Sequence, residues 1–251
     1  PKTAGTTLKF IIRNNHGVRH VNTDKTKRKV FVQDDLEFAR RIFPGPEVLT
    51  GHNLVDPSNN LEQENLTLIT FLREPLARCA SHYQDQVLRR NIPQSFPEWI
   101  AMPSEQNRMV KMIAGEEDLN KAKRLLKEKY TFVGITEQFD ASIRLLAVRY
   151  PHEITLDHYR LLVARDNHIK QEIFRDPALH ALLVENNRLD SALYRFAVEE
   201  VFEPAVEKHR EAMKAVEVPD PKTGRPFTPK IQGSKIYNKF IYRQLLKYLK
   251  K

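Results

Sequence analysis

Cysteine is almost absent from this sequence: the only one among the 251 residues is Cys79. A single thiol excludes an internal disulfide framework and favours a reducing compartment. No apolar run reaches the length of a membrane span, no signal peptide is recognisable, and no cluster of His, Cys, Asp or Glu has metal-ligand spacing. The composition, 41% hydrophobic, favours a soluble globular protein. The residue spacing gives no indication of a metal site.

Acidic residues are missing from positions 222–251, where nine of the 41 Lys and Arg residues lie. The rest of the chain carries 32 basic and 32 acidic residues, so the net charge of +9 is located in this tail. Four prolines between positions 218 and 229 indicate an extended linker, assigned to 216–233. Residues 234–251 then have the pattern of a basic amphipathic helix.

Three interpretations of this basic helix stay open. It could dock on the body of the protein, lie on a membrane surface, or bind an anionic glycan. Nucleic acid is disfavoured because no recognition motif accompanies the charge. The apolar residues expected on one helix face are Tyr237, Phe240, Ile241, Leu245 and Tyr248.

Strand-like and helical patterns alternate over the first 150 residues, and mostly helical patterns follow to about residue 215. Strands are expected at 29–33, 47–50, 66–72 and 130–135, and helices at 8–15, 34–42, 75–90 and 137–149. Such alternation predicts an α/β fold: a parallel sheet flanked by helices, with a helix-rich C-terminal half. We expect residues 1–215 to form one domain.

The opening turn, Pro1 to Thr7, combines one lysine, a glycine and three threonines ahead of an apolar-periodic stretch. Free N–H groups and the helix dipole attract an anion at a helix N-terminus, and Gly5 would let the main chain approach it. The segment therefore predicts a phosphate-binding turn. Because Lys2 precedes the glycine, it differs from the GxxxxGK[ST] loop of enzymes that use ATP or GTP.

A second candidate segment follows the strand expected at 66–72. Arg73 ends the strand, Pro75 suits the first turn of a helix, and Ser81 lies on that helix. An arginine fork and a serine hydroxyl could together bind one phosphate. The expected parallel sheet would bring Arg73, the Lys2 turn, His52 and the 134–137 turn to the carboxyl ends of its strands.

In combination, these segments resemble the sulfotransferases that use 3′-phosphoadenosine 5′-phosphosulfate (PAPS). The resemblance is to the carbohydrate branch that includes the heparan sulfate 2-O- and 6-O-sulfotransferases. The family's 5′-phosphosulfate loop is similar to PKTAGTTL, and its 3′-phosphate motif, an arginine followed eight residues later by a serine, matches Arg73 and Ser81. Two further segments, 130–140 and 187–196, resemble the family's FVGxTExFD and N-x-x-D-x-x-L-Y motifs.

The resemblance, which covers residues 1 to about 203, implies a P-loop-like sheet, and the strand that should precede the first loop is expected upstream of Pro1. It implies that the sulfuryl group of PAPS moves to a hydroxyl of a polysaccharide or glycolipid, without a metal. His52, in a Gly-His pair after a short strand, is the expected general base, and Lys2 would stabilise the leaving phosphate. The residues expected to bind PAPS are Lys2, Thr3, Ala4, Gly5, Thr6, Thr7, Arg73 and Ser81.

Several alternatives to this hypothesis stay open. The acceptor could be a peptide or a small molecule, and the protein could be a P-loop kinase-like phosphotransferase or a non-catalytic binding module. The resemblance implies acceptor-side helices between Phe96 and Gly115, where Trp99 could stack on a sugar or belong to the core. Further candidates for contact with the cofactor or the acceptor are Arg165, Asn167 and Lys170. The expected location is the cytoplasm, either free or at a membrane surface, or the Golgi lumen if an N-terminal anchor was removed.

Overall fold

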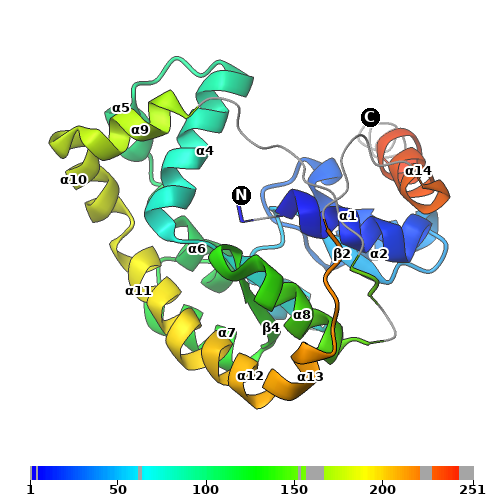
Figure 1. Cartoon of the computed structure of the whole chain (residues 1–251). Helices are drawn as coiled ribbons and strands as arrows, with labels where there is room; N and C mark the ends of the chain where they lie inside the picture. The colour runs from blue at the N-terminus through cyan, green and yellow to red at the C-terminus, as the bar shows by residue number, and fades with distance from the viewer. Residues whose placement is uncertain are drawn as a thin grey trace. The chain divides into compact units, whose positions relative to one another are not determined.

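The computed structural model describes residues 2–3, 5–61, 64–151, 154–156, 167–220 and 228–242. The chain divides into two compact units (Figure 1). Unit 1 comprises Pro1–Gly5, Thr67–Ser142 and Val163–Arg210. Unit 2 comprises Thr6–Leu66, Ile143–Leu162 and Glu211–Lys251. Both are mainly helical, and each contains a pair of parallel strands, so the α/β class is confirmed.

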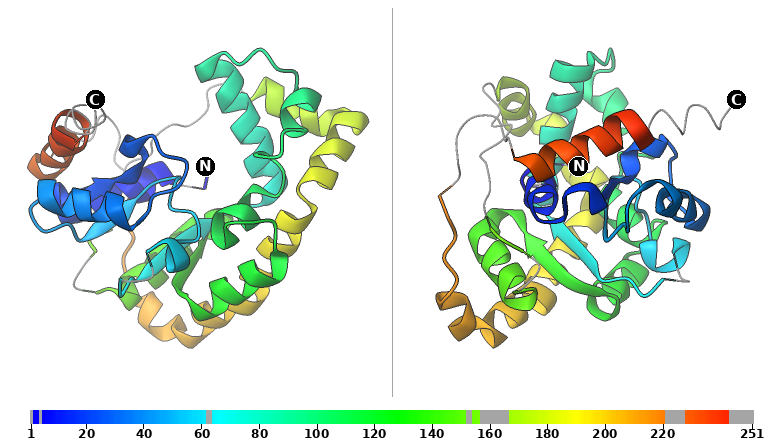
Figure 2. Two further views of the ribbon diagram at one scale, coloured as in Figure 1. Left: turned by 180° about the vertical axis from the view of Figure 1, so that it is seen from behind. Right: turned by 90° about the vertical axis from the view of Figure 1, so that its right-hand side faces the viewer.

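The strands of unit 1 are β3 (Leu68–Leu72) and β4 (Tyr130–Ile135), which lie side by side in parallel (Figure 2). Both agree with the sequence-based prediction. Their register pairs Leu72 with Ile135, so the two strands end at the same level. The segments that follow them, which begin with Arg73 and Thr136, therefore start next to each other.

Helix α4 (Pro75–Arg90) follows β3 and matches its predicted bounds. The Glu74 carboxylate accepts hydrogen bonds from the N–H groups of Leu76 and Ala77, and Pro75 occupies the first turn, where it needs no N–H partner. The other helical elements of unit 1 are α5 (Phe96–Ile100), α6 (Arg108–Ala114), α7 (Leu119–Glu128), η3 (Thr136–Gln138), α9 (His168–Arg175), α10 (Pro177–Asn186), α11 (Arg188–Phe196), the π-helical η4 (Ala197–Phe202) and α12 (Glu203–Lys208).

Trp99 belongs to the hydrophobic core of unit 1. It is 2% exposed, and its ring lies 5.2 Å from that of Tyr83 and 6.3 Å from that of Phe96. Its cluster also contains Cys79, Ala80, Ile100, Ile173 and Leu183. Of the two interpretations of this tryptophan, the core position is the one observed, and Trp99 is not placed to stack on a sugar.

Unit 2 contains β1 (His20–Asn22) and β2 (Val48–Thr50), again parallel. The short strand predicted at 47–50 is confirmed as β2. Its helical elements are η1 (Gly17–Arg19), η2 (Thr23–Thr26), α2 (Gln33–Ile42), α3 (Pro57–Asn60), α14 (Pro229–Ile236) and the π-helical η5 (Tyr237–Tyr242). Three helices begin in one unit and continue into the other: α1 (Gly5–His16), α8 (Phe139–Arg149) and α13 (Arg210–Lys214).

The strand predicted at 29–33 is wrong. Phe31 donates one backbone hydrogen bond to the Asn53 carbonyl (2.8 Å), but its side chain is buried in an apolar cluster with Leu36 and Leu61. Helix α2 already begins at Gln33, and the Val32 N–H donates to the Asp35 carboxylate (3.2 Å). Tertiary packing of Phe31 and this helix start outweigh the β-propensity of the segment.

The single P-loop-like sheet expected from the sequence is not confirmed. Among the described residues the strands form two separate pairs, β1 with β2 and β3 with β4. The first pair is only three residues long in each strand. Strand β1 was not predicted because two of its three residues, His20 and Asn22, are polar, although all three are buried in the structure. An alternating or apolar strand pattern is therefore absent there.

The C-terminal segment of unit 2 is docked on the unit as far as Tyr242. Tyr242 is buried, and its ring contacts that of Phe43 (5.2 Å) in a cluster with Val21 and Ala39. Helix α14 begins at Pro229, inside the range expected to be a linker. The predicted apolar face is also wrong in part: Phe240 is 56% exposed, whereas the polar residues Ser234 and Asn238 are buried. Leu245, Tyr248 and positions 221–227 lie outside the described residues.

Asn238 explains why a polar face of this segment is buried. Its side-chain amide donates to the His20 carbonyl (2.8 Å), and its side-chain oxygen accepts from the Asn22 N–H (2.6 Å). These are the two backbone groups that a neighbouring strand would use on that side of β1. The side chain thus takes the place of a strand.

His20 is completely buried between two hydroxyls. Its Nδ1 lies 3.0 Å from Ser234 Oγ, and its Nε2 lies 2.7 Å from Thr50 Oγ1. Burial, supported by the positive charges of Arg13 and Lys9, lowers the pKa of His20 to about 3. The imidazole is therefore neutral in the folded protein at neutral pH.

We expect this histidine to make the protein less stable in mild acid. In the unfolded chain His20 takes up a proton below pH about 6.5, whereas the folded protein resists protonation down to about pH 3. The free energy of unfolding should then fall by up to about 1.4 kcal/mol per pH unit for this group as the pH decreases from about 6.5. Urea titrations between about pH 7 and 5, where few carboxylates titrate, would measure it. An equal slope in His20→Gln would contradict the assignment.

Candidate functional site

The opening turn leads directly into helix α1, as the phosphate-binding prediction requires. The helix begins at Gly5, and Thr6 and Thr7 occupy its first turn. Lys2 has a left-handed backbone (φ 68°), and Thr3 is partly exposed. Ala4 lies outside the described residues. A Cβ added at Gly5 would meet no atom within 4 Å, so neither packing nor backbone conformation demands glycine there.

Lys2 and Arg73 are brought together in unit 1. Arg73 Nη1 donates a hydrogen bond to the main-chain carbonyl of Lys2 (3.0 Å). The ammonium group of Lys2 forms an ion pair with Asp85 on α4 (3.3 Å), which also pairs with Arg89 at the same distance. Two of the predicted phosphate-binding segments, 71 positions apart, are therefore in direct contact. Ser81 lies on the same helix as Asp85 and is partly exposed.

Glu137, one turn beyond β4, is a third member of this site. Its carboxylate lies 3.7 Å from Arg73 Nε, accepts from the Glu74 N–H with both oxygens (3.2 Å each), and accepts from the Tyr194 hydroxyl (2.9 Å). Burial and the hydrogen bond to Glu137 raise the pKa of Tyr194, which keeps its hydroxyl protonated. Sequence reasoning missed Asp85 and the contacts of Glu137 and Tyr194, although the latter two belong to the family-like motifs.

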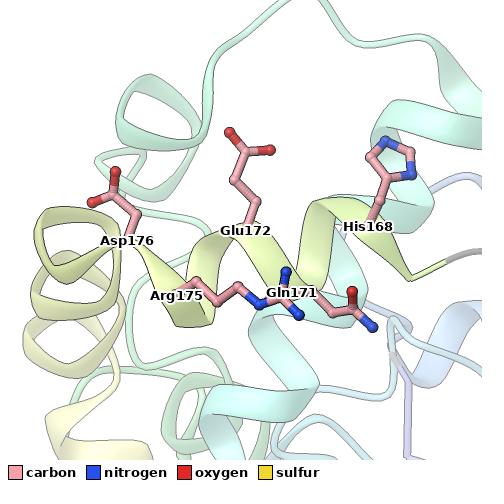
Figure 3. A pocket seen from close by; sticks show the side chains of 5 residues that line it. All are labelled: His168, Gln171, Glu172, Arg175 and Asp176. Atoms are coloured by element: carbon pink, nitrogen blue, oxygen red, sulfur yellow. The ribbon is translucent and has the colours of Figure 1, made fainter.

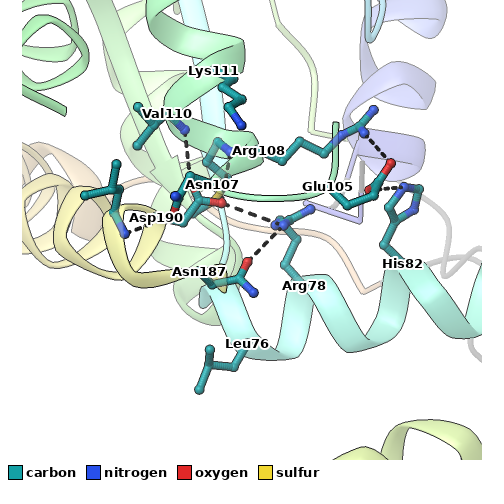
Figure 4. Close-up of polar contacts among 12 residues, drawn as sticks. Leu76, Arg78, His82, Glu105, Asn107, Arg108, Val110, Lys111, Asn187 and Asp190 are labelled. Atoms are coloured by element: carbon teal, nitrogen blue, oxygen red, sulfur yellow. Dashed lines mark hydrogen bonds and ion pairs between the residues drawn. The ribbon is translucent and has the colours of Figure 1, made fainter. Parts of the chain in front are cut away.

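Asn187 and Asp190, from the fourth motif, instead lie in a buried structural network (Figure 4). Asp190 accepts hydrogen bonds from the N–H groups of Met109 and Val110 at the start of α6 (2.9 Å each). Its carboxylate lies 3.7 Å from Arg78 Nη2, and that nitrogen also donates to Asn187 Oδ1 (3.3 Å). Arg78 is 1% exposed. The network joins α4, α6 and α11.

His82 is unsuited to general-base catalysis. It is buried on α4, 5.6 Å from the Trp99 ring, and its Nε2 lies 3.5 Å from the Glu105 carboxylate (Figure 4). Burial, together with nearby positive charges that include Arg108, lowers the pKa of His82 to about 2. It packs within unit 1.

His52 belongs to unit 2 and is exposed in the turn after β2. Its backbone N–H donates to Asp24 Oδ1 (2.6 Å), which fixes the main chain of the turn. The preceding Gly51 has no room for a side chain, because an added Cβ would lie 1.9 Å from Thr23 Oγ1. Packing thus requires glycine at the first position of the Gly-His pair.

A shallow, open hollow lies along helix α9 (Figure 3). Its lining comes only from this helix and the residue after it: His168, Gln171, Glu172, Arg175 and Asp176. Lys170 and Asn167, which the sequence suggested as contacts to the cofactor or acceptor, form hydrogen bonds within unit 1. The Lys170 N–H donates to the Gln84 side chain (3.2 Å), and Asn167 accepts from the same side chain (3.5 Å). Arg165 lies outside the described residues. We assign no ligand to this hollow.

Metal-binding clusters and membrane-spanning helices are both absent from the described ranges. No group of three His, Cys, Asp or Glu side chains in these ranges could hold a metal ion. None of the helices in the same part of the chain is long and apolar enough to cross a membrane. No protein-family model matches the chain, and no curated protein matches it either.

Proposed function

We propose that this protein is a PAPS-dependent sulfotransferase that acts on a carbohydrate hydroxyl. The contact between Arg73 and the Lys2 carbonyl is the observation that carries this proposal. PAPS bears its 5′-phosphosulfate and its 3′-phosphate on one ribose, so groups that bind these two anions must be neighbours. In unit 1, Lys2 and Arg73 from the two segments that resemble the family's anion-binding motifs meet this requirement, and Glu137 and Tyr194 of the other two motifs lie beside Arg73.

The roles in the proposed reaction follow from the chemistry of each residue. The acceptor oxygen attacks sulfur, the bond between sulfur and the bridging phosphate oxygen breaks, and adenosine 3′,5′-bisphosphate leaves. Lys2 would stabilise the charge that develops on that phosphate oxygen, while Thr3 and the first turn of α1 would bind the 5′-phosphate. Arg73 and Ser81 would bind the 3′-phosphate. His52 would take the acceptor proton.

Two measurements test the proposal. The purified protein is incubated with PAPS carrying ³⁵S and a panel of glycans, glycolipids and peptides, and label transfer to a glycan or glycolipid is expected. In parallel, adenosine 3′,5′-bisphosphate should raise the melting temperature more than ATP with magnesium does. Stabilisation by ATP–magnesium alone would instead favour a phosphotransferase, and the absence of both effects would contradict the proposal.

Gly5→Ala separates a ligand-binding role of this glycine from a structural one. Open space surrounds Gly5, and helices favour alanine over glycine, so folding should be unaffected or stabilised by up to about 1 kcal/mol. A methyl group at this position would project where the phosphate is proposed to approach the main chain. We therefore expect weaker binding of adenosine 3′,5′-bisphosphate in isothermal titration without a lower melting temperature. Unchanged affinity would remove Gly5 from the proposed site.

A further inference from the structure

Protein groups contact two of the three nitrogens of the Arg73 guanidinium. Nη1 donates to the Lys2 carbonyl (3.0 Å), and Nε faces the Glu137 carboxylate (3.7 Å). Among the described residues these are the partners of its side chain, and they leave Nη2 for an external anion. The side chain is 23% exposed, so a ligand can reach it.

Glu137 is itself fixed by two donors. The N–H of Glu74, the residue after Arg73, donates to both carboxylate oxygens (3.2 Å each), and the Tyr194 hydroxyl donates to Oε2 (2.9 Å). The in-register ends of β3 and β4 bring Arg73 and Glu137 into range, and α11 supplies Tyr194. A carboxylate with these partners has little freedom to rotate.

We infer that Tyr194 and Glu137 are positioning residues that orient Arg73 toward an anionic group of the substrate. On the proposed function, on which this inference rests, that group is the 3′-phosphate of PAPS. The negative charge of Glu137 opposes anion binding, but across a partly exposed pair this costs little. The arrangement fixes the orientation of the guanidinium and so the direction in which Nη2 donates, and phosphate recognition by arginine depends on such geometry.

Tyr194→Phe is the sharpest test because it removes one hydrogen bond and no charge. We expect binding of adenosine 3′,5′-bisphosphate to weaken by about tenfold, from the usual contribution of a hydrogen bond to a charged group. In turnover, KM for PAPS should rise while kcat changes little, since the 3′-phosphate contact is made equally in the ground and transition states. Tyr83→Phe is the matched control, because the Tyr83 hydroxyl donates to the Gln94 carbonyl (3.0 Å) in the same unit.

A second readout follows Arg73 without any nucleotide. The ¹⁵N–¹H signal of Arg73 Nε, assigned by its loss in Arg73→Lys, should shift and exchange faster with water in Tyr194→Phe and in Glu137→Gln. It should be unchanged in Tyr83→Phe. If the unaltered protein binds no nucleotide, the proposed function fails and the positioning is judged by this signal alone. The inference is overturned if Tyr194→Phe leaves both the affinity and the signal unchanged, or if Tyr83→Phe produces the same effects.

Discussion

Replacing Lys2 by alanine is expected to reduce kcat for sulfuryl transfer by about 10²- to 10³-fold, the usual loss when one group that stabilises developing charge is removed. The structure pairs the Lys2 ammonium with Asp85 at 3.3 Å, with both side chains partly exposed. Such a pair contributes little to folding, so stability should change by less than about 1 kcal/mol. Single-turnover assays with labelled PAPS would measure the loss, and thermal melts would verify folding.

Lys121→Ala is the matched control for this variant. Lys121 also pairs with an acidic residue, Glu116 (2.9 Å), but it lies on α7 and has no place in the proposed site. It should turn over like the unaltered protein. If Lys2→Ala did so as well, the opening turn would not be the binding site of the 5′-phosphosulfate, and the proposed function would lose its catalytic cation.

Replacing Asp190 by alanine is expected to lower the free energy of unfolding by about 3–5 kcal/mol, a larger loss than for Lys2→Ala or Gly5→Ala. Asp190 is completely buried and accepts from two N–H groups at the start of α6. Its loss would leave Arg78 as a buried cation without a carboxylate partner. Burial raises the pKa of Asp190 above its ordinary value, and Arg78 and the two N–H groups offset only part of this rise.

Urea denaturation of Asp190→Ala and Asp118→Ala would check this expectation. Asp118 caps α7 by accepting from the Lys121 N–H (2.9 Å), but its side chain is exposed rather than buried beside an arginine. Its replacement should cost only about 1 kcal/mol. Asp190→Asn keeps an acceptor for one N–H group and should lie between the two. Similar losses for Asp118→Ala and Asp190→Ala would show that the buried ion pair with Arg78 adds no stability beyond the hydrogen bonds of Asp190 to the start of α6.

Local signals explain most of what the sequence predicted correctly. Strand β3 and helix α4 are apparent because an apolar run ends at Leu72 and Pro75 marks a helix start. Strand β1 is three buried residues, and the 29–33 segment has strand propensity but a different packing environment. In both cases tertiary contacts decide the structure, and a single sequence does not contain them.

The sequence likewise identified only part of the candidate site. Lys2 and Arg73 could be identified from residue chemistry and motif likeness, and the structure places them in contact. Asp85 could not, because nothing in a helix sequence tells which carboxylate meets a lysine 83 positions away. Asn187 and Asp190 carried a motif, but the motif does not distinguish a ligand contact from the buried network that they form.

The amide of Asn238 has a consequence for shortened forms of this chain. The Asn238 side chain occupies the backbone groups of β1 that do not pair with β2. A protein that ends before α14 would therefore expose the His20 carbonyl and the Asn22 N–H as an unpaired strand edge. Uncapped strands of this kind recruit strands from other molecules. Removal of the basic tail would then promote self-association. A loss of activity in such a shortened protein would therefore reflect aggregation as well as a missing contact with an acceptor.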